Sequence, residues 1–289
     1  MSAITKVLPR KILSRLVGVI VHLPFPWPIT QILIFVFAQY YKINLNEADD
    51  EGVGFKSLGD FFVRKLKSSA RPLGTSDFLH CADSKITQQG DLLDGHLIQA
   101  KGRTYRVDHL FDDPRAYETY KNGYFLTYYL CPTDYHRVHA PITGIIDIMK
   151  YLPGDLWPVN EWSTHNVPNI FCLNERVIVN MKNDHGSVSL VFVGATNVGF
   201  IEMAFDGRLQ GNHGQVPREF QYSPTVKINK GEELGRFRMG STVVLLMDMA
   251  MKKYLLSQAG VNENELSKHI HFANSQTGEV KVRENFLKT

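Results

Sequence analysis

Residues 235–246 read Gly-Arg-Phe-Arg-Met-Gly-Ser-Thr-Val-Val-Leu-Leu and predict a β-strand. The five residues after Ser241 are β-branched or leucine, a composition typical of strands. The start of this strand is unusual, because the unhindered Gly240 precedes Ser241. A serine hydroxyl held beside its own preceding peptide carbonyl can attack that carbonyl and form an ester. Gly-Ser-Thr is a common sequence, so this stretch alone predicts only a strand.

From about Phe78 onward the chain is rich in strand-length runs, which are separated by Gly, Pro and Asn-Asp. These runs are residues 125–130, 144–151, 176–180, 187–193, 199–205 and 242–247. Helical signal among them is confined to residues 113–122 and 251–259, so the βαβ alternation of a parallel sheet is absent from the sequence. We therefore predict an α+β fold, with a predominantly antiparallel β core and an N-terminal helical membrane-associating region.

Residues 1–43 differ in composition from the rest and form the predicted N-terminal segment. Two apolar runs, residues 12–23 and 29–41, flank Pro24-Phe25-Pro26-Trp27-Pro28, which forbids one continuous helix. Each run is shorter than the ~20 residues needed to span a bilayer. Basic residues and Trp, Phe and Leu are typical of helices that lie in the headgroup region, so we predict a membrane-binding helical hairpin rather than a signal peptide. The alternative is that both helices pack on the core.

The predicted catalytic domain comprises residues 44–289. It begins with an acidic, glycine-containing linker over residues 44–54. Residues 57–66 follow as a short amphipathic helix, which Ser57 or Asp60 would cap.

Composition and charge exclude several classes of protein. The chain has 289 residues, 44% of them apolar and 21% charged, which is ordinary for a globular protein. A formal net charge of +3 gives no argument for nucleic-acid binding. Cys81, Cys131 and Cys172 form no Cys-x-x-Cys motif, so we expect free, at least partly buried thiols in a reducing compartment, and neither a zinc ribbon nor a redox motif.

Two segments carry candidate catalytic groups besides Ser241. His136 and His139 lie three residues apart beside a proline, which favours a strand edge or turn over a helix. They are a weak zinc signal without a third ligand, but histidine titrates near neutrality and suits acid–base catalysis. Structural or surface roles are the alternative. Asp83 is placed to orient a histidine and hold its tautomer, and its alternative is a plain turn residue.

Many short pieces of the chain occur in the order found in one family, and the chain resembles phosphatidylserine decarboxylase of the short bacterial type. The pieces include Phe61-Phe62-Val63-Arg64, Arg71-Pro72, Ala82-Asp83, Gln99-Ala100-Lys101-Gly102, Asp134-Tyr135-His136-Arg137-Val138-His139, Pro153-Gly154-Asp155-Leu156, Asn166-Val167-Pro168-Asn169, Asn174-Glu175-Arg176-Val177, Val193-Gly194-Ala195 and Gly240-Ser241-Thr242. The last piece is similar to the family's self-cleavage motif, Leu-Gly-Ser-Thr.

The resemblance implies a self-processing enzyme. The proenzyme would cut itself between Gly240 and Ser241 into a β chain, 1–240, and an α chain, 241–289. Asp83, His139 and Ser241 match the family's Asp-His-Ser triad, in which the histidine takes the serine proton. Ser241 would become an N-terminal pyruvoyl group, which serves as the covalent cofactor in place of pyridoxal phosphate or a metal. This group forms a Schiff base with phosphatidylserine and releases CO2 to give phosphatidylethanolamine. His136 is the expected proton donor.

The resemblance also implies partners and a location. The substrate is a bilayer lipid, so a peripheral position on an anionic membrane surface is expected, on the cytoplasmic side of the cell's inner membrane. The α and β chains of one precursor would stay together, and the family commonly forms homodimers. Two positions depart from the family pattern: Cys81-Ala82-Asp83-Ser84 replaces Pro-Ala-Asp-Gly, and Met239 replaces leucine. Ser84 stands where the family has glycine, and serine tolerates positive φ poorly, so a turn that needs positive φ would be strained there.

Two other functions remain open at this stage. One is a Ser-His-Asp lipid or ester hydrolase that uses the same residues without self-cleavage, although the sequence has no Gly-x-Ser-x-Gly elbow. The other is a non-enzymatic β-rich module at membranes.

Overall fold

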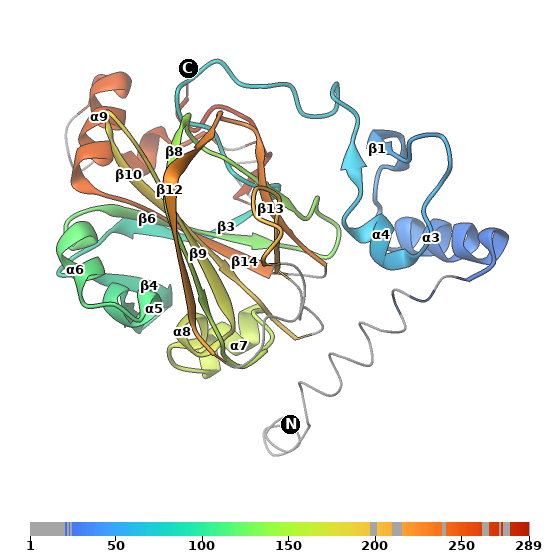
Figure 1. Cartoon of the computed structure of the whole chain (residues 1–289), viewed down its shortest axis with the longest axis horizontal. Coiled ribbons are helices and arrows are strands. Elements are labelled where there is room, and N and C mark those ends of the chain that lie inside the picture. Colours follow the sequence, from blue (N-terminus) through green and yellow to red (C-terminus); the bar gives the residue numbers. More distant parts are fainter. Residues whose placement is uncertain are drawn as a thin grey trace.

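One large antiparallel sheet forms the centre of the computed structural model, with small sheets and short helices around it (Figure 1). The structure describes residues 21, 23, 25–196, 201–209, 216–238, 241–261, 266–271, 273 and 278–288. In spatial order, the strands of the large sheet are β12 (Arg218–Ile228), β8 (Gly144–Leu152), β9 (Arg176–Asn183), β10 (Gly186–Val193), β14 (Ser241–Met247), β6 (Tyr124–Leu130), β3 (Ser84–Asp91) and β15 (Glu279–Val280). Every neighbouring pair is antiparallel, which confirms the predicted α+β class and antiparallel core.

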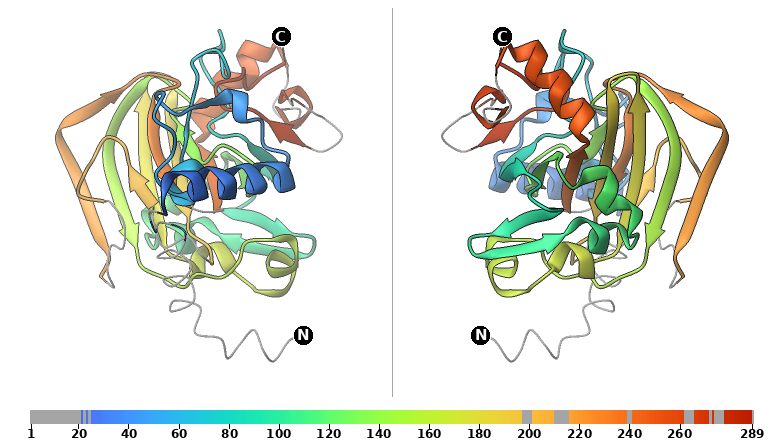
Figure 2. Two further views of the ribbon diagram at one scale, coloured as in Figure 1. Left: turned by 90° about the vertical axis from the view of Figure 1, so that its right-hand side faces the viewer. Right: turned by 90° about the vertical axis from the view of Figure 1, so that its left-hand side faces the viewer.

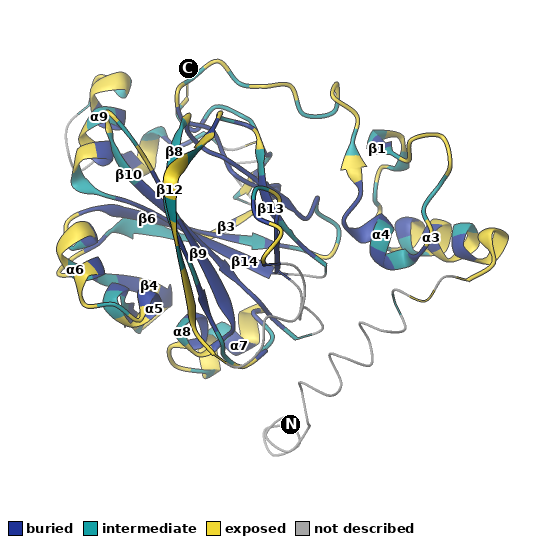
Figure 3. Cartoon of the chain, viewed as in Figure 1, coloured by how far each residue is buried: buried dark blue, intermediate teal, exposed yellow. Residues whose placement is uncertain are grey.

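Strand β14 is central in this sheet, between β10 and β6. All of its residues are buried, in keeping with its unbroken apolar run. Helix α9 (Met249–Ala259) follows directly and packs against β10 and β14. The dark-blue strands in Figure 3 show that the buried core of the molecule follows this sheet.

Five of the predicted strands are confirmed, as β6, β8, β9, β10 and β14. The sixth is shorter: β11 (Ile201–Met203) forms, whereas residues 199 and 200 lie outside the described residues. The runs predicted from the sequence do not include β12. It carries Pro224 and many charged or polar residues, and it lies at the sheet edge, where a missing N–H donor is tolerated.

Smaller elements surround the sheet. Helices α6 (Arg115–Tyr120) and α9 confirm the two predicted helical regions. The remaining elements of the core are β4 (His96–Ala100), β5 (Arg103–Arg106), α5 (Val107–Phe111), β7 (Arg137–His139), α7 (Glu161–Asn166), α8 (Ile170–Leu173), β13 (Glu233–Phe237) and α10 (Leu266–His269). Strands β11, β13 and β7 form a three-stranded sheet, and its strand β7 carries one of the predicted catalytic histidines.

The N-terminal elements lie together at one end of the molecule (Figures 1 and 2). Helix α3 (Trp27–Tyr41) confirms the second predicted helix, whereas most of the first apolar run lies outside the described residues. Ile34 and Ala38 of α3 pack against Phe61 of α4 (Leu58–Phe62). No helix in the described ranges is long and apolar enough to cross a bilayer.

Two expectations about the segment after α3 were wrong. Residues 44–54 are not simply a linker, because η1 (Leu45–Glu47) and β1 (Ala48–Asp49) form within them. The Ser57 cap is confirmed, since its side chain accepts a hydrogen bond from the Asp60 N–H. However, α4 does not continue to residue 66, because Lys65 and Leu66 form β2 (Lys65–Leu66) and pair with β1.

Candidate active site

Ser241 is the first residue of β14 and is fully buried. It pairs with Leu130 at the end of β6. Its Oγ is buried and has no hydrogen-bond partner among the described residues. Met239 and Gly240, which include one half of the predicted cleavage site, lie outside the described residues. An unpartnered hydroxyl in the interior normally carries a cost, so its position in a central strand calls for a functional explanation.

The ring of His139 is fixed at both nitrogens. Nδ1–H donates to the carbonyl of Gly231 at 2.7 Å, and Nε2 lies 3.1 Å from the Tyr135 hydroxyl, which donates to it. Burial lowers the pKa of His139 to about 4, so the imidazole is neutral at pH 7. The backbone carbonyl therefore sets the tautomer, and the lone pair of Nε2 is the available base.

His136 immediately precedes β7 and carries a second neutral imidazole. Its Nδ1–H donates to the carbonyl of Asp134 at 2.8 Å, and its ring packs on Phe62 with 4.1 Å between centroids. Nε2 is buried and, among the described residues, has no hydrogen-bond partner. Burial lowers the pKa of His136 to about 3. The sequence singled out this residue, and the structure gives it a free nitrogen in an apolar setting.

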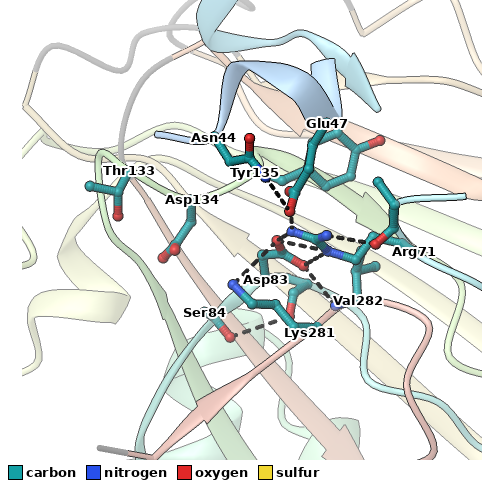
Figure 4. Close-up of polar contacts among 12 residues, drawn as sticks. Asn44, Glu47, Arg71, Asp83, Ser84, Thr133, Asp134, Tyr135, Lys281 and Val282 are labelled. Carbon is teal, nitrogen blue, oxygen red and sulfur yellow. Dashed lines mark hydrogen bonds and ion pairs between the residues drawn. The ribbon is translucent and has the colours of Figure 1, made fainter. Parts of the chain in front are cut away.

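Asp83 is buried and engages an arginine rather than a histidine (Figure 4). Arg71 Nη2 donates to Oδ2 at 2.6 Å, and the Val282 N–H donates to Oδ1 at 2.8 Å. Lys281 Nζ lies 3.7 Å from Oδ2. These contacts offset the cost of burying a carboxylate. No hydrogen bond joins Asp83 to His139 in the described part of the chain, so the triad roles remain a prediction.

The register of the sheet explains the separation of Asp83 and Ser241. Lys85 of β3 pairs with Tyr129 of β6, and Tyr129 pairs with Thr242 of β14. Asp83 and Ser241 therefore lie at the same end of the sheet, two strand spacings or roughly 10 Å apart. The histidine-bearing segment continues from β6, the strand between them.

Backbone hydrogen bonds hold the histidine segment against its neighbours. The His139 N–H donates to the Cys81 carbonyl at 2.8 Å, so β7 runs beside the segment that carries the predicted aspartate. The Phe237 N–H donates to the His136 carbonyl at 3.0 Å, where β13 ends shortly before Ser241. Segments far apart in the sequence thus converge on one site.

Some residues of the site were not predicted from the sequence. Arg71 and Tyr135 occur there only within motifs, and Arg283 has no predicted role. Arg283 reaches the site through its contact with the Gly231 carbonyl, which is distant in sequence, so no local signal identifies it. Serine in place of the family's glycine causes no strained turn at position 84, because Ser84 begins β3 and is not among the described residues with positive φ. The three cysteines are free, as expected, and Cys81 is fully buried.

Three buried histidines make the stability of the protein depend on pH. Burial lowers the pKa of His80 and His136 to about 3 and that of His139 to about 4, from an ordinary value of 6.5. Near pH 6 the unfolded chain binds protons that the folded chain does not, so the free energy of unfolding falls as pH falls below 6.5. Burial raises the pKa of Asp134 to about 6, which acts in the opposite direction because the folded state binds that proton first.

We therefore expect the free energy of unfolding to fall by about 2–3 kcal/mol between pH 6.5 and 5.5, at roughly 1 kcal/mol per histidine less the Asp134 contribution. Urea titrations at a series of pH values measure this change. A His80→Gln variant, which removes one of the three titrating imidazoles, should reduce the slope by about two-fifths. A free energy of unfolding that stays constant over this pH interval would contradict the neutral, buried state of the histidines.

These observations define the class of protein: an antiparallel α+β fold with a buried serine, two neutral histidines and a buried carboxylate at one end of its central sheet. Comparison with known proteins identifies the family. A model of the phosphatidylserine decarboxylase family matches residues 58–273, and the chain belongs to this family.

Relatives of this chain bear the name phosphatidylserine decarboxylase proenzyme. The protein of Myxococcus xanthus is 38% identical over 245 residues, which cover 84% of this chain and 87% of that protein. The protein of Yersinia enterocolitica is 40% identical over 260 residues, covering 87% and 88%. The protein of Vibrio parahaemolyticus is 40% identical over 247 residues, covering 83% and 86%. The hydrolase and the non-enzymatic module find no support in these matches.

Proposed function

We propose that this protein is a phosphatidylserine decarboxylase that matures by cutting itself before Ser241. The observation that carries the proposal is the buried Ser241, whose Oγ has no partner among the described residues, in a chain of this family. The decisive experiment is mass spectrometry of the purified protein together with an assay for conversion of phosphatidylserine to phosphatidylethanolamine. Two chains and lipid turnover are expected.

In the cleavage step, Ser241 Oγ attacks the Gly240 carbonyl and the peptide bond is exchanged for an ester. His139 is the proposed base, because its pKa keeps it neutral and its Nδ1–H is already committed to Gly231. The hydroxyl of Tyr135 has to give up Nε2 for this role. Elimination at Cβ then releases the chain that ends in Gly240 as a carboxylate, and hydrolysis of the new N-terminus releases ammonia.

The surroundings of Ser241 fit the pyruvoyl group that this sequence of steps leaves there. Conversion removes the hydroxyl, and among the described residues no hydrogen bond to Oγ is lost when it goes. The pyruvoyl carbonyl supplies the chemistry of a ketone that condenses with the substrate amine and accepts the electron pair left by CO2. Ser241 is still a serine in this chain, so the geometry is that of the unprocessed form.

His136 is the proposed donor of the proton that replaces CO2 on the substrate carbon. Because its Nδ1–H is bound to the Asp134 carbonyl, Nε2 is the nitrogen that exchanges a proton with the substrate. Burial lowers the pKa of His136 to about 3, so Nε2 has to take up a proton before it can donate one to the substrate carbon.

The two chains are held together without the peptide bond. Strand β14 of the α chain is hydrogen-bonded on both sides, to β10 and β6 of the β chain. The C-terminal segment adds long-range backbone bonds, including His80 N–H to the Glu284 carbonyl and Phe286 N–H to the Phe78 carbonyl. We therefore expect the α and β chains to separate only on unfolding.

The exposed face of α3 is the proposed membrane contact. Thr30, Ile34 and Ala38 form its buried face, whereas the rest of the helix presents large apolar side chains to the surroundings. Those exposed are Trp27, Ile29, Ile32, Leu33, Phe35, Val36 and Tyr40. A contiguous apolar surface of this kind is typical of interaction sites, and a lipid substrate requires access to a bilayer. Homodimer formation and a position on the cytoplasmic side of the cell membrane remain predictions.

The double variant Ile32→Glu/Val36→Glu tests this contact, because both side chains are more than half exposed on one face of α3. We expect its partitioning onto phosphatidylglycerol-containing liposomes to fall on the order of a hundredfold, since two apolar side chains no longer enter the bilayer. Sedimentation with liposomes measures the partitioning. The matched control is Leu93→Glu/Val216→Glu, which replaces equally exposed apolar residues outside α3 and should bind like wild type. Equal losses in both variants would contradict a role specific to α3.

A further inference from the structure

A basic pocket lies beside the proposed base His139 and has a volume of about 200 Å³. Its charged lining consists of five cations, Lys65, Lys67, Arg71, Arg137 and Arg283, and one carboxylate, Glu233. The pocket is smaller than the roughly 300–1,000 Å³ that encloses a drug-sized ligand, so it suits a headgroup-sized fragment. Its strong positive excess indicates an anionic ligand.

Most of these cations are committed to carboxylates of the protein. Arg71 pairs with Asp83, Arg137 pairs with Glu233 at 2.7 Å, and Lys65 pairs with Glu51 at 2.8 Å. Lys67 and Arg283 differ, because no carboxylate lies within ion-pair distance of either one among the residues that the structure describes.

Arg283 is held in an unusual conformation that directs it to this place. Its φ is 68°, in the left-handed region that a residue with a side chain adopts at a cost. The backbone is pinned there, because its N–H donates to the His80 carbonyl at 3.0 Å and its carbonyl accepts from the Gly74 N–H at 2.8 Å. Strain that the surroundings enforce at a site next to a catalytic group suggests a functional reason.

The guanidinium of Arg283 shares a hydrogen-bond acceptor with the proposed base, His139. Its Nε–H donates to the Gly231 carbonyl at 3.0 Å, and the same carbonyl accepts the Nδ1–H of His139. The positive charge of Arg283 also contributes to the lowered pKa of His139, after the larger effect of burial. The two terminal nitrogens of the guanidinium have no partner among the described residues, which leaves a planar pair of donors for a ligand.

We propose that the basic pocket binds a phosphate group through Arg283 and Lys67. A planar guanidinium donates two parallel hydrogen bonds to phosphate oxygens, and a lysine adds a point charge. This inference rests on the proposed function for the source of that phosphate, which is the phosphodiester of the substrate headgroup. The pocket is built from both products of cleavage, since Lys67 lies in the β chain and Arg283 in the α chain.

The carboxylate of the substrate is the less suitable ligand for Arg283. Decarboxylation removes the negative charge of that group, so an ion pair to it would stabilise the ground state more than the transition state and slow the reaction. The phosphodiester keeps its charge throughout the reaction. An arginine that binds it anchors the substrate equally in both states, and its loss should affect KM rather than kcat.

The test begins with Arg283→Asn, because asparagine tolerates the left-handed conformation. The processed enzyme is assayed on phosphatidylserine in mixed micelles, with KM expressed as surface mole fraction. We expect KM to rise on the order of ten- to hundredfold, with kcat within about threefold of wild type. Arg115→Asn, at an exposed arginine on α6, is the matched control and should leave both constants unchanged. An unchanged KM in Arg283→Asn would overturn the headgroup assignment.

A second variant, Lys67→Gln, guards against misfolding or failed processing of the first. Lys67 is exposed and, in the described part of the chain, its side chain makes no ion pair, so the fold should tolerate its replacement. We expect a KM increase of about threefold or more. An unchanged KM in this variant, with a correctly processed chain, would also count against the phosphate site.

Calorimetric titration of the processed enzyme separates the possible sources of the phosphate. The probes are inorganic phosphate and glycerophosphoglycerol, a phosphodiester without an amine. Weaker binding of the diester in Arg283→Asn, alongside the raised KM, supports the headgroup site. Binding of inorganic phosphate alone, with KM unchanged, would indicate a free-phosphate site and refute the assignment. If the wild type binds the diester but forms no phosphatidylethanolamine, the proposed function fails and the anion site stands.

Discussion

Replacement of Ser241 by alanine is expected to leave one uncut chain without decarboxylase activity. In the proposed reaction, the serine oxygen is both the nucleophile that attacks the Gly240 carbonyl and the atom that departs from Cβ in the elimination. Alanine has neither capacity, so the pyruvoyl group cannot form and turnover should fall to background. The fold should be retained, because Oγ has no hydrogen-bond partner among the described residues and its removal leaves none of them unpaired.

Intact-mass spectrometry and a lipid assay measure both consequences. Wild type should yield a chain of residues 1–240 and a chain of residues 241–289 that begins with pyruvoyl instead of serine. Ser241→Ala should yield the full chain of 32.9 kDa. Thr127→Val is the matched control, because it removes a buried hydroxyl that has no hydrogen-bond partner among the described residues and lies on β6, outside the self-cleavage motif; it should be cut and active. An active, uncut wild-type chain whose Ser241 reacts with a fluorophosphonate would instead support the hydrolase.

Replacement of Asp83 or His139 is expected to slow self-cleavage at least a hundredfold, since a general base contributes about 10²–10⁴-fold to a rate. His139→Ala removes the proposed base outright. Asp83→Asn removes the carboxylate that, in the triad hypothesis, orients His139 and stabilises its protonated imidazole. Time courses of chain cleavage in freshly purified precursor measure the rate, and circular dichroism checks that each variant is folded. Cleavage of His139→Ala at the wild-type rate would refute its role as base.

The contact between Asp83 and Arg71 makes the aspartate result ambiguous unless a second variant is measured. Asp83→Asn leaves Arg71 without its closest partner, which by itself costs about 3–5 kcal/mol when the pair is buried. The double variant Asp83→Asn/Arg71→Gln removes both charges and should restore much of that stability. If Asp83 serves the triad, the double variant folds and stays uncut. If Asp83 serves only to hold Arg71, the double variant recovers cleavage, and the triad assignment is wrong.

Arg71 connects this site to the N-terminal elements. It pairs with Glu47 of η1 at 3.1 Å as well as with Asp83, so one guanidinium links the segment after α3 to the predicted catalytic aspartate. Figure 4 shows the Arg71 guanidinium in contact with the carboxylates of both Glu47 and Asp83.

The sequence alone determined the elements whose signal is local. Strands such as β14, β10 and β6 are long apolar runs rich in β-branched and aromatic residues, and their position in a buried sheet follows from that composition. The serine of interest and both histidines also stood out locally, through Gly240-Ser241 and the motif around His139. Elements with weak local signals were missed or misjudged, notably β12 with its Pro224, and the short β2, which is set by pairing with β1.

Only the tertiary structure decided how these residues meet. The partner of Asp83 is Arg71 together with the N–H of Val282, and the latter contact spans 199 positions in the sequence. The shared Gly231 carbonyl places Arg283 beside His139, a relation that no motif contains. The physical reason is that a strand preference depends on neighbouring side chains, whereas a buried ion pair or a strained arginine depends on strand order and register. Those follow from the packing of the whole chain.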